Sequence, residues 1–403
     1  MRAHQEIAFA LNPKSRAGVL DTGLTRRFSP TVADRVRNFH RRFPQYKPTP
    51  LVSLSHLSRS LGVSRVWVKD ESKRFGLKAF KVLGAAYALA TLMAKQLGIE
   101  PEELFSGRLT PLPAKKGGLP PTFVTATDGN HGRAVAWAAQ RLGARAVVYM
   151  PKGSSRARYD AIRSHGAETR IIEGNYDDAV HLAAEQAQKQ EGYVLIQDTA
   201  FPGYQEVPAK IMQGYLTIVD EALEQLEGER PTHLFVQCGV GSLAASQQAY
   251  LVERYGRERP LFAVVEAEQA ACYFKSIVEG LGCPRKIEGD LQSLMAGLAC
   301  GEPSALAWEI LSRYGDIFVA CKDSVAVKGM RLLGNPLPGD ENIVSGESGA
   351  VTTGLLATIL AHPLNEELRD AFRIDARAKV LLISTEGDTD PALYRKIMME
   401  ENF

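Results

Sequence analysis

The sequence predicts an α/β protein in which a smaller parallel α/β domain interrupts a large α/β domain, with a cleft between the two. Residues 122–198 alternate four strand-like apolar segments with three helical ones, which is typical of a parallel sheet with right-handed crossovers. The flanking segments also alternate strands and helices, without an internal repeat. The chain has 403 residues, 45% of them hydrophobic, which is enough for a large core. We therefore predict a large domain from residues 1–117 and 204–403 and a small domain from residues 118–203.

The first part of the large domain leads into one conspicuous helix. Residues 1–45 are expected to form a polar, irregular lead-in, followed by a short helix at 54–61 and a strand at 65–70. The alanine-rich run 79–90 predicts the opening and body of a buried helix, because Ala and Leu are strong helix formers. Residues 102–121 are rich in Pro and Gly and predict an exposed loop and a domain boundary.

The rest of the chain keeps a regular rhythm, interrupted only at residues 272–302, which we expect to be irregular. In chain order we expect strand 123–127, helix 132–143, strand 144–151, helix 155–166, strand 168–174, helix 176–192, strand 193–198, helix 204–227, strand 232–238, helix 243–256, strand 261–268, helix 305–315, strand 317–322, helices 324–334 and 346–360, and a final strand and turn at 378–388.

Composition and charge exclude several classes of protein. The 48 basic and 46 acidic residues leave a net charge of +2, which provides no field for nucleic acid or an anionic membrane. No apolar run reaches membrane-spanning length, and the N-terminus shows no clear signal peptide. The five cysteines form no CxxC pair and no cluster with histidines at zinc-ligand spacing. We therefore expect a cytoplasmic protein in a reducing compartment, with no metal site.

Lys81 is out of place at the mouth of the predicted alanine-rich helix. Removing an ammonium group from water is costly, so either the side chain extends to solvent or a covalent bond removes the charge. A desolvated lysine loses its proton readily and becomes a nucleophile for a carbonyl, as in a Schiff base. Gly84, Ala85 and Ala86 are small enough for a second backbone to approach this helix closely.

A glycine-rich turn follows the strand predicted at 232–238. Gly239, Val240, Gly241 and Ser242 open the next helix, where converging backbone amides and the helix dipole suit a single phosphate. The turn matches neither the GxGxxG fingerprint nor the GxxxxGK[ST] loop. The alternative is a turn whose glycines are present only for steric reasons.

A second polar turn, Thr125–Gly132, lies between a predicted strand and helix. Thr127, Asp128, Asn130 and His131 are crowded into it, and its helix-start amides with the threonine hydroxyls suit a carboxylate. The alternative is an elaborate helix cap, since Asp and Asn cap helices routinely. His131 is expected to be structural rather than catalytic.

Three further polar positions follow predicted strands or begin helices. Asp198 ends a strand, on the edge where parallel sheets bind ligands, although a strand-end Asp is commonly a turn residue. Glu347 begins a helix, where capping explains it equally well. Ser384 and Thr385 end the last strand, where a hydroxyl suits a ring nitrogen or simply a turn.

Together these motifs resemble a known family. AFKVLGA, DGNHG, GVGS and STEGD, in this order, resemble the tryptophan synthase β-type (fold type II) pyridoxal phosphate enzymes, and the resemblance covers residues 48–390. More narrowly, KAFK, TATDGNHG, IQDTA and SGESGA are similar to those of diaminopropionate ammonia-lyases. The resemblance implies pyridoxal 5′-phosphate as cofactor, a small amino-acid substrate, an active site in the cleft and a homodimer.

The resemblance also implies a role for individual residues toward the cofactor. Lys81 would form the Schiff base, and Asn130 would hydrogen-bond the phenolic oxygen of the cofactor. Residues 239–242 would hold its phosphate. Thr385, or else Ser384, would meet its pyridine nitrogen, and such a neutral partner would make the ring a weaker electron sink than an Asp would.

The implied reaction is elimination of ammonia from D- and L-2,3-diaminopropionate, giving pyruvate and two ammonia. Asp198 would take the Cα proton of the L-isomer and Asp128 that of the D-isomer, with Thr127 and His131 among the substrate-binding residues. Alternatively, either aspartate binds the substrate's β-ammonium while free Lys81 acts as the base. A serine/threonine dehydratase or related β-eliminase is the alternative function, although those enzymes usually have Ser where this chain has Asp128. A non-catalytic module that binds phosphate or an amino acid is a more distant alternative.

Overall fold

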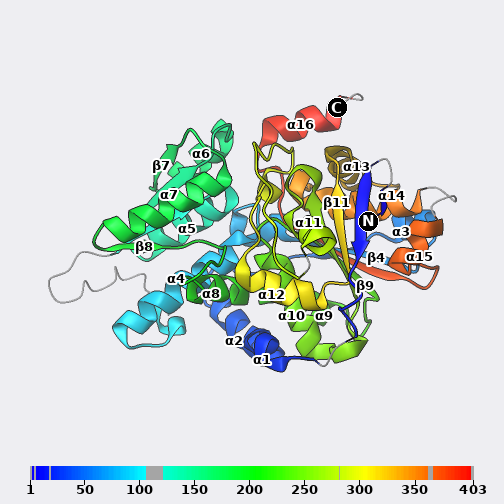
Figure 1. The fold of residues 1–403 in the computed structure, drawn as a ribbon, viewed down its shortest axis with the longest axis horizontal. Helices are drawn as coiled ribbons and strands as arrows, with labels where there is room; N and C mark the ends of the chain where they lie inside the picture. The colour runs from blue at the N-terminus through cyan, green and yellow to red at the C-terminus, as the bar shows by residue number, and fades with distance from the viewer. Residues whose placement is uncertain are drawn as a thin grey trace.

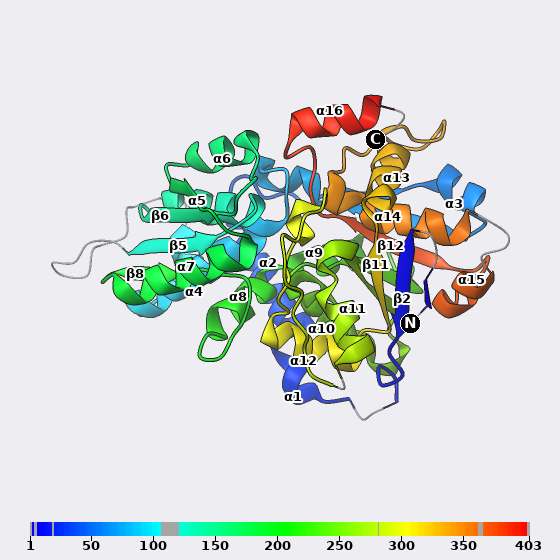
Figure 2. The ribbon, with the colours of Figure 1, turned by 45° about the horizontal axis from the view of Figure 1, so that its top comes forward.

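The computed structural model describes residues 2–3, 6–17, 20–105, 121–280, 282–361 and 366–400, which form two β-sheets with helices packed around them (Figure 1). The four-stranded sheet and its helices lie to one side of the eight-stranded sheet, and the view in Figure 2 shows the same separation. Within the described residues, no helix is both long enough and apolar enough to cross a membrane.

The larger sheet has five parallel strands in its centre and antiparallel strands at both edges. The central strands are buried on both faces, as the fully buried sequence LFAVVEA of one of them shows, and they therefore read as continuous apolar runs. The strands in sheet order are β1 (Arg2–Ala3), β2 (Ile7–Leu11), β11 (Ile317–Cys321), β10 (Leu261–Ala267), β9 (His233–Gln237), β12 (Lys379–Ser384), β4 (Arg65–Asp70) and β3 (Leu51–Ser53).

Successive side chains of these strands enter two different hydrophobic cores, because strand residues alternate between the two faces of a sheet. In β10, Phe262 and Val264 belong to one core, and Ala263 and Val265 belong to the other. The first core is covered by α2 (Pro30–His40), α4 (Lys81–Leu97), α8 (Glu206–Gly214), α9 (Leu216–Gln225), α10 (Ser242–Tyr255) and α12 (Ala305–Tyr314). The second core is covered by α3 (Ser55–Leu61), α13 (Asp323–Gly334), α14 (Glu347–Leu360), α15 (Glu366–Phe372) and α16 (Pro391–Met399).

The smaller sheet is entirely parallel. One of its faces contributes to the first core of the larger sheet, so that this core extends across both sheets. Its elements are β7 (Glu168–Ile171), β6 (Arg145–Met150), β5 (Thr122–Ala126) and β8 (Tyr193–Leu195) in sheet order, with α5 (Asn130–Arg141), α6 (Arg156–Arg163) and α7 (Tyr176–Lys189). The remaining helices in the part of the chain that the structure describes are α1 (Thr22–Thr25) and α11 (Cys272–Glu279), with short 3-10 turns at Arg26–Phe28, Glu71–Gly76, Pro101–Phe105, Gly256–Glu258, Glu268–Ala270 and Ala296–Leu298.

A buried ionic network stabilises the end of β4. The Nζ atom of Lys69 lies 2.8 Å from Glu221 on α9, and Arg74 lies 2.8 Å from the same carboxylate and 2.7 Å from Glu71. All four side chains are 0% exposed. Such a network depends on every member, because removing one partner leaves a buried charge uncompensated.

The predicted fold class is confirmed, and three local predictions are wrong. The expected irregular lead-in at residues 1–45 contains β2, which pairs with β11, and α2, which packs in the first core. The segment 272–302 begins with the helix α11, and the single helix expected at 204–227 is two helices that meet at Tyr215. The predicted loop at 102–121 lies mostly outside the described residues. The domain boundaries stay a prediction.

Candidate active site

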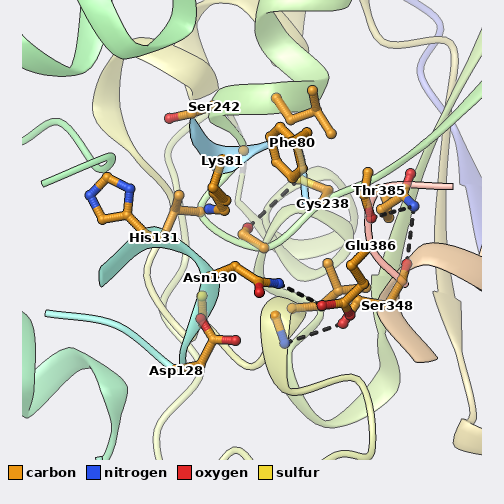
Figure 3. A pocket seen from close by; sticks show the side chains of 18 of the residues that line it. Phe80, Lys81, Asp128, Asn130, His131, Cys238, Ser242, Ser348, Thr385 and Glu386 are labelled. Atoms are coloured by element: carbon orange, nitrogen blue, oxygen red, sulfur yellow. Dashed lines mark hydrogen bonds between the residues drawn. The ribbon is translucent and has the colours of Figure 1, made fainter. Parts of the chain in front are cut away.

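A cavity lies at the carboxyl ends of β5, β9 and β12, and Figure 3 shows side chains that line it. Lys81 enters it from the start of α4, three polar residues enter from the turn after β5, and the glycine-rich turn enters from the start of α10. The residues that line it are Phe80, Lys81, Asp128, Asn130, His131, Tyr176, Gln237, Cys238, Gly239, Val240, Gly241, Ser242, Leu243, Gly297, Leu298, Cys300, Ser348, Thr385 and Glu386. Of the residues predicted for the site, Thr127 and Asp198 are not among them.

Close packing of α4 against α8 fixes Lys81. A Cβ atom on Gly84 would lie 2.5 Å from the ring of Tyr215, and one on Gly214 would lie 2.4 Å from the carbonyl oxygen of Leu83. The two helices therefore meet where both lack side chains, as the small residues after Lys81 predict. Lys81 is the first residue of α4, so this contact sets where its side chain leaves the helix.

Lys81 forms an ion pair with Asp198 instead of extending to solvent. Its Nζ lies 2.5 Å from Asp198 Oδ2, and its side chain is 18% exposed while that of Asp198 is 1% exposed. Burial is the largest single influence and lowers the pKa of Lys81, but Asp198, Tyr215 and Asp128 together outweigh it and raise the pKa above its ordinary value. Burial would likewise raise the pKa of Asp198, but the charges of Lys81 and His131 lower it to about 2. The pair is therefore ionised at neutral pH.

The turn after β5 holds its four predicted residues in different ways. The Oγ1 of Thr127 accepts a hydrogen bond from the amide of Gly129 at 2.8 Å, so this hydroxyl shapes the turn. His131 is buried and its Nε2 donates to the carbonyl of Ile196 at 2.9 Å, which agrees with the expected structural role. Its Nδ1 lies 3.9 Å from Asp198.

Asn130 and Asp128 face the cavity from the same turn. The amide nitrogen of Asn130 donates to Glu386 at 2.5 Å, and Figure 3 shows the two side chains turned toward each other. Burial raises the pKa of Asp128, and the positive charges of Arg158 and Lys81 partly oppose this rise. No side-chain hydrogen-bond partner holds the Asp128 carboxylate within the described part of the chain, so it is available to a ligand.

The turn between β9 and α10 is shaped by what surrounds it. Gly241 has a φ of +100°, and a Cβ atom there would lie 2.1 Å from the hydroxyl of Tyr273. That hydroxyl donates to the carbonyl of Val240 at 2.8 Å, and the Oγ of Ser242 donates to the carbonyl of Asp198. Within the described residues, no side-chain cap is formed at the start of α10, so its first amides remain available for an anion.

The end of β12 distinguishes the two candidate hydroxyls. The Oγ of Ser384 donates to that of Ser345 at 2.8 Å, whereas Thr385 lines the cavity. The side-chain amide of Gln237 donates to the Oγ1 of Thr385 at 3.0 Å, which leaves the threonine proton free to be donated. The geometry therefore favours Thr385 over Ser384 as the hydroxyl that meets a ligand.

Several residues of the site were not predicted from the sequence. Gln237, Glu386 and Tyr176 line the cavity, and the Oη of Tyr176 donates to Asp198 at 3.4 Å. Glu347, which the sequence offered as a polar position with helix capping as its alternative, forms a buried ion pair with Arg158 at 2.8 Å. Burial and nearby Glu386 raise its pKa to about 7, against the opposing charge of Arg158. Glu386 stands inside the STEGD motif, and its place in that motif was the sequence feature that could have identified it as a residue of the site.

Comparison with known proteins agrees with this geometry. The family described as pyridoxal-phosphate dependent enzyme matches residues 42–385. Diaminopropionate ammonia-lyase of Escherichia coli (strain K12) is 48% identical over 375 residues, which cover 93% of this chain and 92% of the relative.

Two crystal structures of the Escherichia coli enzyme are similar over the whole fold. Both are 44% identical in sequence and cover 98% of this chain and 97% of their own. The complex with an aminoacrylate-PLP azomethine reaction intermediate gives a TM-score of 0.88, and the complex with D-serine gives 0.89. The resemblance carried by the motifs is thus confirmed: this chain belongs to the diaminopropionate ammonia-lyase family of pyridoxal-phosphate dependent enzymes.

Proposed function

We propose that this chain uses pyridoxal 5′-phosphate to eliminate ammonia from 2,3-diaminopropionate, releasing pyruvate and two ammonia. The observation that carries the proposal is one cavity that contains both Lys81, paired with a buried carboxylate, and an uncapped glycine-rich helix start. A lysine amine and a single-phosphate site are what this cofactor requires of a protein. The similarity to diaminopropionate ammonia-lyases supports the choice of substrate.

The residues of the cavity fit the cofactor. The turn 239–242 suits its phosphate, because the uncapped amides of α10 are available there. Thr385 has a free hydroxyl proton for the pyridine nitrogen, and Asn130 has a second amide proton for the phenolic oxygen. Lys81 would hold the aldehyde carbon. When bound, the cofactor supplies an electron sink that acidifies the Cα–H of an amino acid.

We assign Asp198 the Cα proton of the L-isomer. Its pKa of about 2 makes it a poor base while Lys81 is an ammonium ion. Any change that removes this positive charge removes the main cause of the low pKa, and burial then raises the pKa of Asp198 toward the range of a general base. Asp198 thus becomes an effective base only when Lys81 is no longer positively charged.

We assign Asp128 the Cα proton of the D-isomer. It reaches the cavity from the turn after β5, whereas Asp198 reaches Lys81 from the end of β8, so the two carboxylates come from different strands. The substrate carboxylate is assigned to the first turn of α5, which has no side-chain cap, with Thr127 holding the shape of the turn and His131 beside it. The competing role for either aspartate is to bind the substrate's β-ammonium.

Pyruvate release from separate D- and L-2,3-diaminopropionate, with D- and L-serine as controls, tests this function. We expect both diaminopropionate isomers to be turned over and serine to be slow. In Asp128→Asn, turnover of the D-isomer should be lost selectively, and in Asp198→Asn that of the L-isomer. Fast turnover of L-serine alone would instead indicate a dehydratase. Loss of both isomers in either variant would favour the ammonium-binding role.

We also propose that the chain is a cytoplasmic homodimer. The resemblance to its family supports the dimer, and the free thiols of all five cysteines support a reducing compartment. Light scattering coupled to gel filtration would test the homodimer, and the mass of a monomer would contradict it. Fractionation of the source cells would test the cytoplasmic location.

A further inference from the structure

Arg158 joins the two sides of the active site without lining its cavity. It belongs to α6, beside the smaller sheet, and donates to Glu347 at the start of α14 at 2.8 Å and to Thr389 at 3.4 Å. The residue is 7% exposed. A guanidinium this deeply buried must have anionic partners, because it cannot lose its proton.

The alkyl part of Arg158 supports the turn that holds Asp128. A Cβ atom on Gly129 would lie 2.9 Å from the Cδ of Arg158 and 3.3 Å from its Cβ. The backbone between Asp128 and Asn130 therefore rests on the arginine stem. Asp128 and Arg158 also line a second cavity, which shares Asp128 and Tyr176 with the first.

The charge of Arg158 acts on Asp128 in a crowded acidic environment. Burial favours the neutral carboxylic acid at Asp128, and Arg158 is the largest influence that opposes it. The charged and titratable groups that face Asp128 are Arg158 from α6, Lys81 from α4, Glu386 after β12, Tyr176 from α7 and Cys300. Those that face Arg158 are Asp128, Glu347 from α14, Glu386 and Asp390.

Asp198 lies outside this influence. Its charge state is set mainly by burial, Lys81 and His131, and Arg158 is not among the principal groups that act on it. Lys81 acts on both aspartates, whereas Arg158 is a principal influence on Asp128 alone. Removing the charge of Arg158 should therefore change the charge state of Asp128 more than that of Asp198.

We propose that Arg158 is a positioning residue that holds the 128–130 turn and favours the carboxylate form of Asp128, so that it determines how well the enzyme uses the substrate isomer served by Asp128. This inference rests on the proposed function, in which that isomer is D-2,3-diaminopropionate. Glu347 competes with Asp128 for the same guanidinium and thereby limits how strongly Arg158 favours the carboxylate form of Asp128.

The test compares Arg158→Met, which keeps an alkyl stem but removes the charge, with Arg158→Lys, which keeps the charge. In Arg158→Met we expect the acidic limb of kcat/KM for the D-isomer to move up by about one pH unit, so that at pH values on this limb kcat/KM falls roughly tenfold. The L-isomer should change less than about twofold, because Asp198 does not depend on Arg158. Arg158→Lys should restore most of the D-activity. Arg156→Gln, an exposed position on the same helix, is the matched control.

A readout independent of turnover is the titration of Asp128 itself in the holoenzyme. Carboxyl 13C NMR of aspartate-labelled protein, assigned by difference from Asp128→Asn, should show a higher pKa for Asp128 in Arg158→Met. Glu347→Gln should lower the pKa of Asp128, because Glu347 no longer competes with Asp128 for Arg158. If Arg158→Met does not fold, this variant tests whether Arg158 acts on Asp128. An equal loss of D- and L-turnover, or an unmoved Asp128 titration, would overturn the proposal. If Asp128→Asn leaves D-turnover intact, the role assigned to Asp128 in the proposed function fails instead, and the titration still tests whether Arg158 acts on Asp128.

Discussion

Substitution of Gly241 by alanine tests whether the glycine-rich turn has the shape that the cofactor phosphate requires. The new Cβ atom would lie 2.1 Å from the Oη of Tyr273, 2.6 Å from its Cζ and 2.9 Å from the Cβ of Ala307. Tyr273 would have to move, and with it the hydrogen bond that its hydroxyl donates to the carbonyl of Val240. The backbone at Gly241 also has a φ of +100°, which is unfavourable for alanine.

Three costs combine in Gly241→Ala. The positive φ costs about 1–2 kcal/mol, overpacking about 1–3 kcal/mol and the lost hydrogen bond about 1 kcal/mol, so the free energy of unfolding should fall by about 3–6 kcal/mol. Gly62→Ala is the matched control, since Gly62 has a φ of +71° but no atom within 4 Å of its added Cβ. Only the backbone cost of about 1–2 kcal/mol applies there.

Denaturant unfolding and cofactor titration would measure both consequences. Displacing one amide from the phosphate should raise the dissociation constant of pyridoxal 5′-phosphate roughly 10- to 100-fold, because a hydrogen bond to a charged group contributes about 1.5–3 kcal/mol. Gly62→Ala should bind the cofactor like the parent protein. If Gly241→Ala matched Gly62→Ala in both stability and affinity, the steric description of the turn would be refuted.

Three further predictions concern buried titratable side chains. Lys81→Ala should abolish pyruvate release and the visible absorbance of the bound cofactor, and an unchanged spectrum would contradict the role of Lys81. Glu221→Gln should lower the free energy of unfolding by about 3–5 kcal/mol, because two buried cations lose their carboxylate, whereas the exposed Glu173→Gln should cause no measurable loss. Burial lowers the pKa of His40 from 6.5 to about 3, so the folded state binds fewer protons than the unfolded state between these values. The stability contributed by neutral His40 is present above pH 6.5 and falls by up to about 1.4 kcal/mol per pH unit below it. His40→Gln should therefore show a shallower decline between pH 6.5 and 4 in urea unfolding, and a parallel decline would contradict this reasoning.

Local patterns were sufficient to predict most of the helices and strands. The alternation of apolar strands and helices around residues 122–198 predicted the parallel sheet, because each element carries its own periodicity. The edge strand β2 escaped prediction because its apolar run is short and its partner β11 lies about 300 residues away. The position of an edge strand in a sheet is a property of its partner as much as of its own sequence.

The candidate residues of the site can be found in the sequence, since Lys81, the turn 127–131, the turn 239–242 and Thr385 stand in motifs of a few residues each. Their partners became known from the folded structure. The partners of Lys81 and Asn130 lie 117 and 256 positions further along the chain, and that of Arg158 lies 189 positions further. The physical reason is that an ion pair or a pKa depends on distance and burial in space. Neither quantity exists until the two sheets have folded and brought their carboxyl ends together.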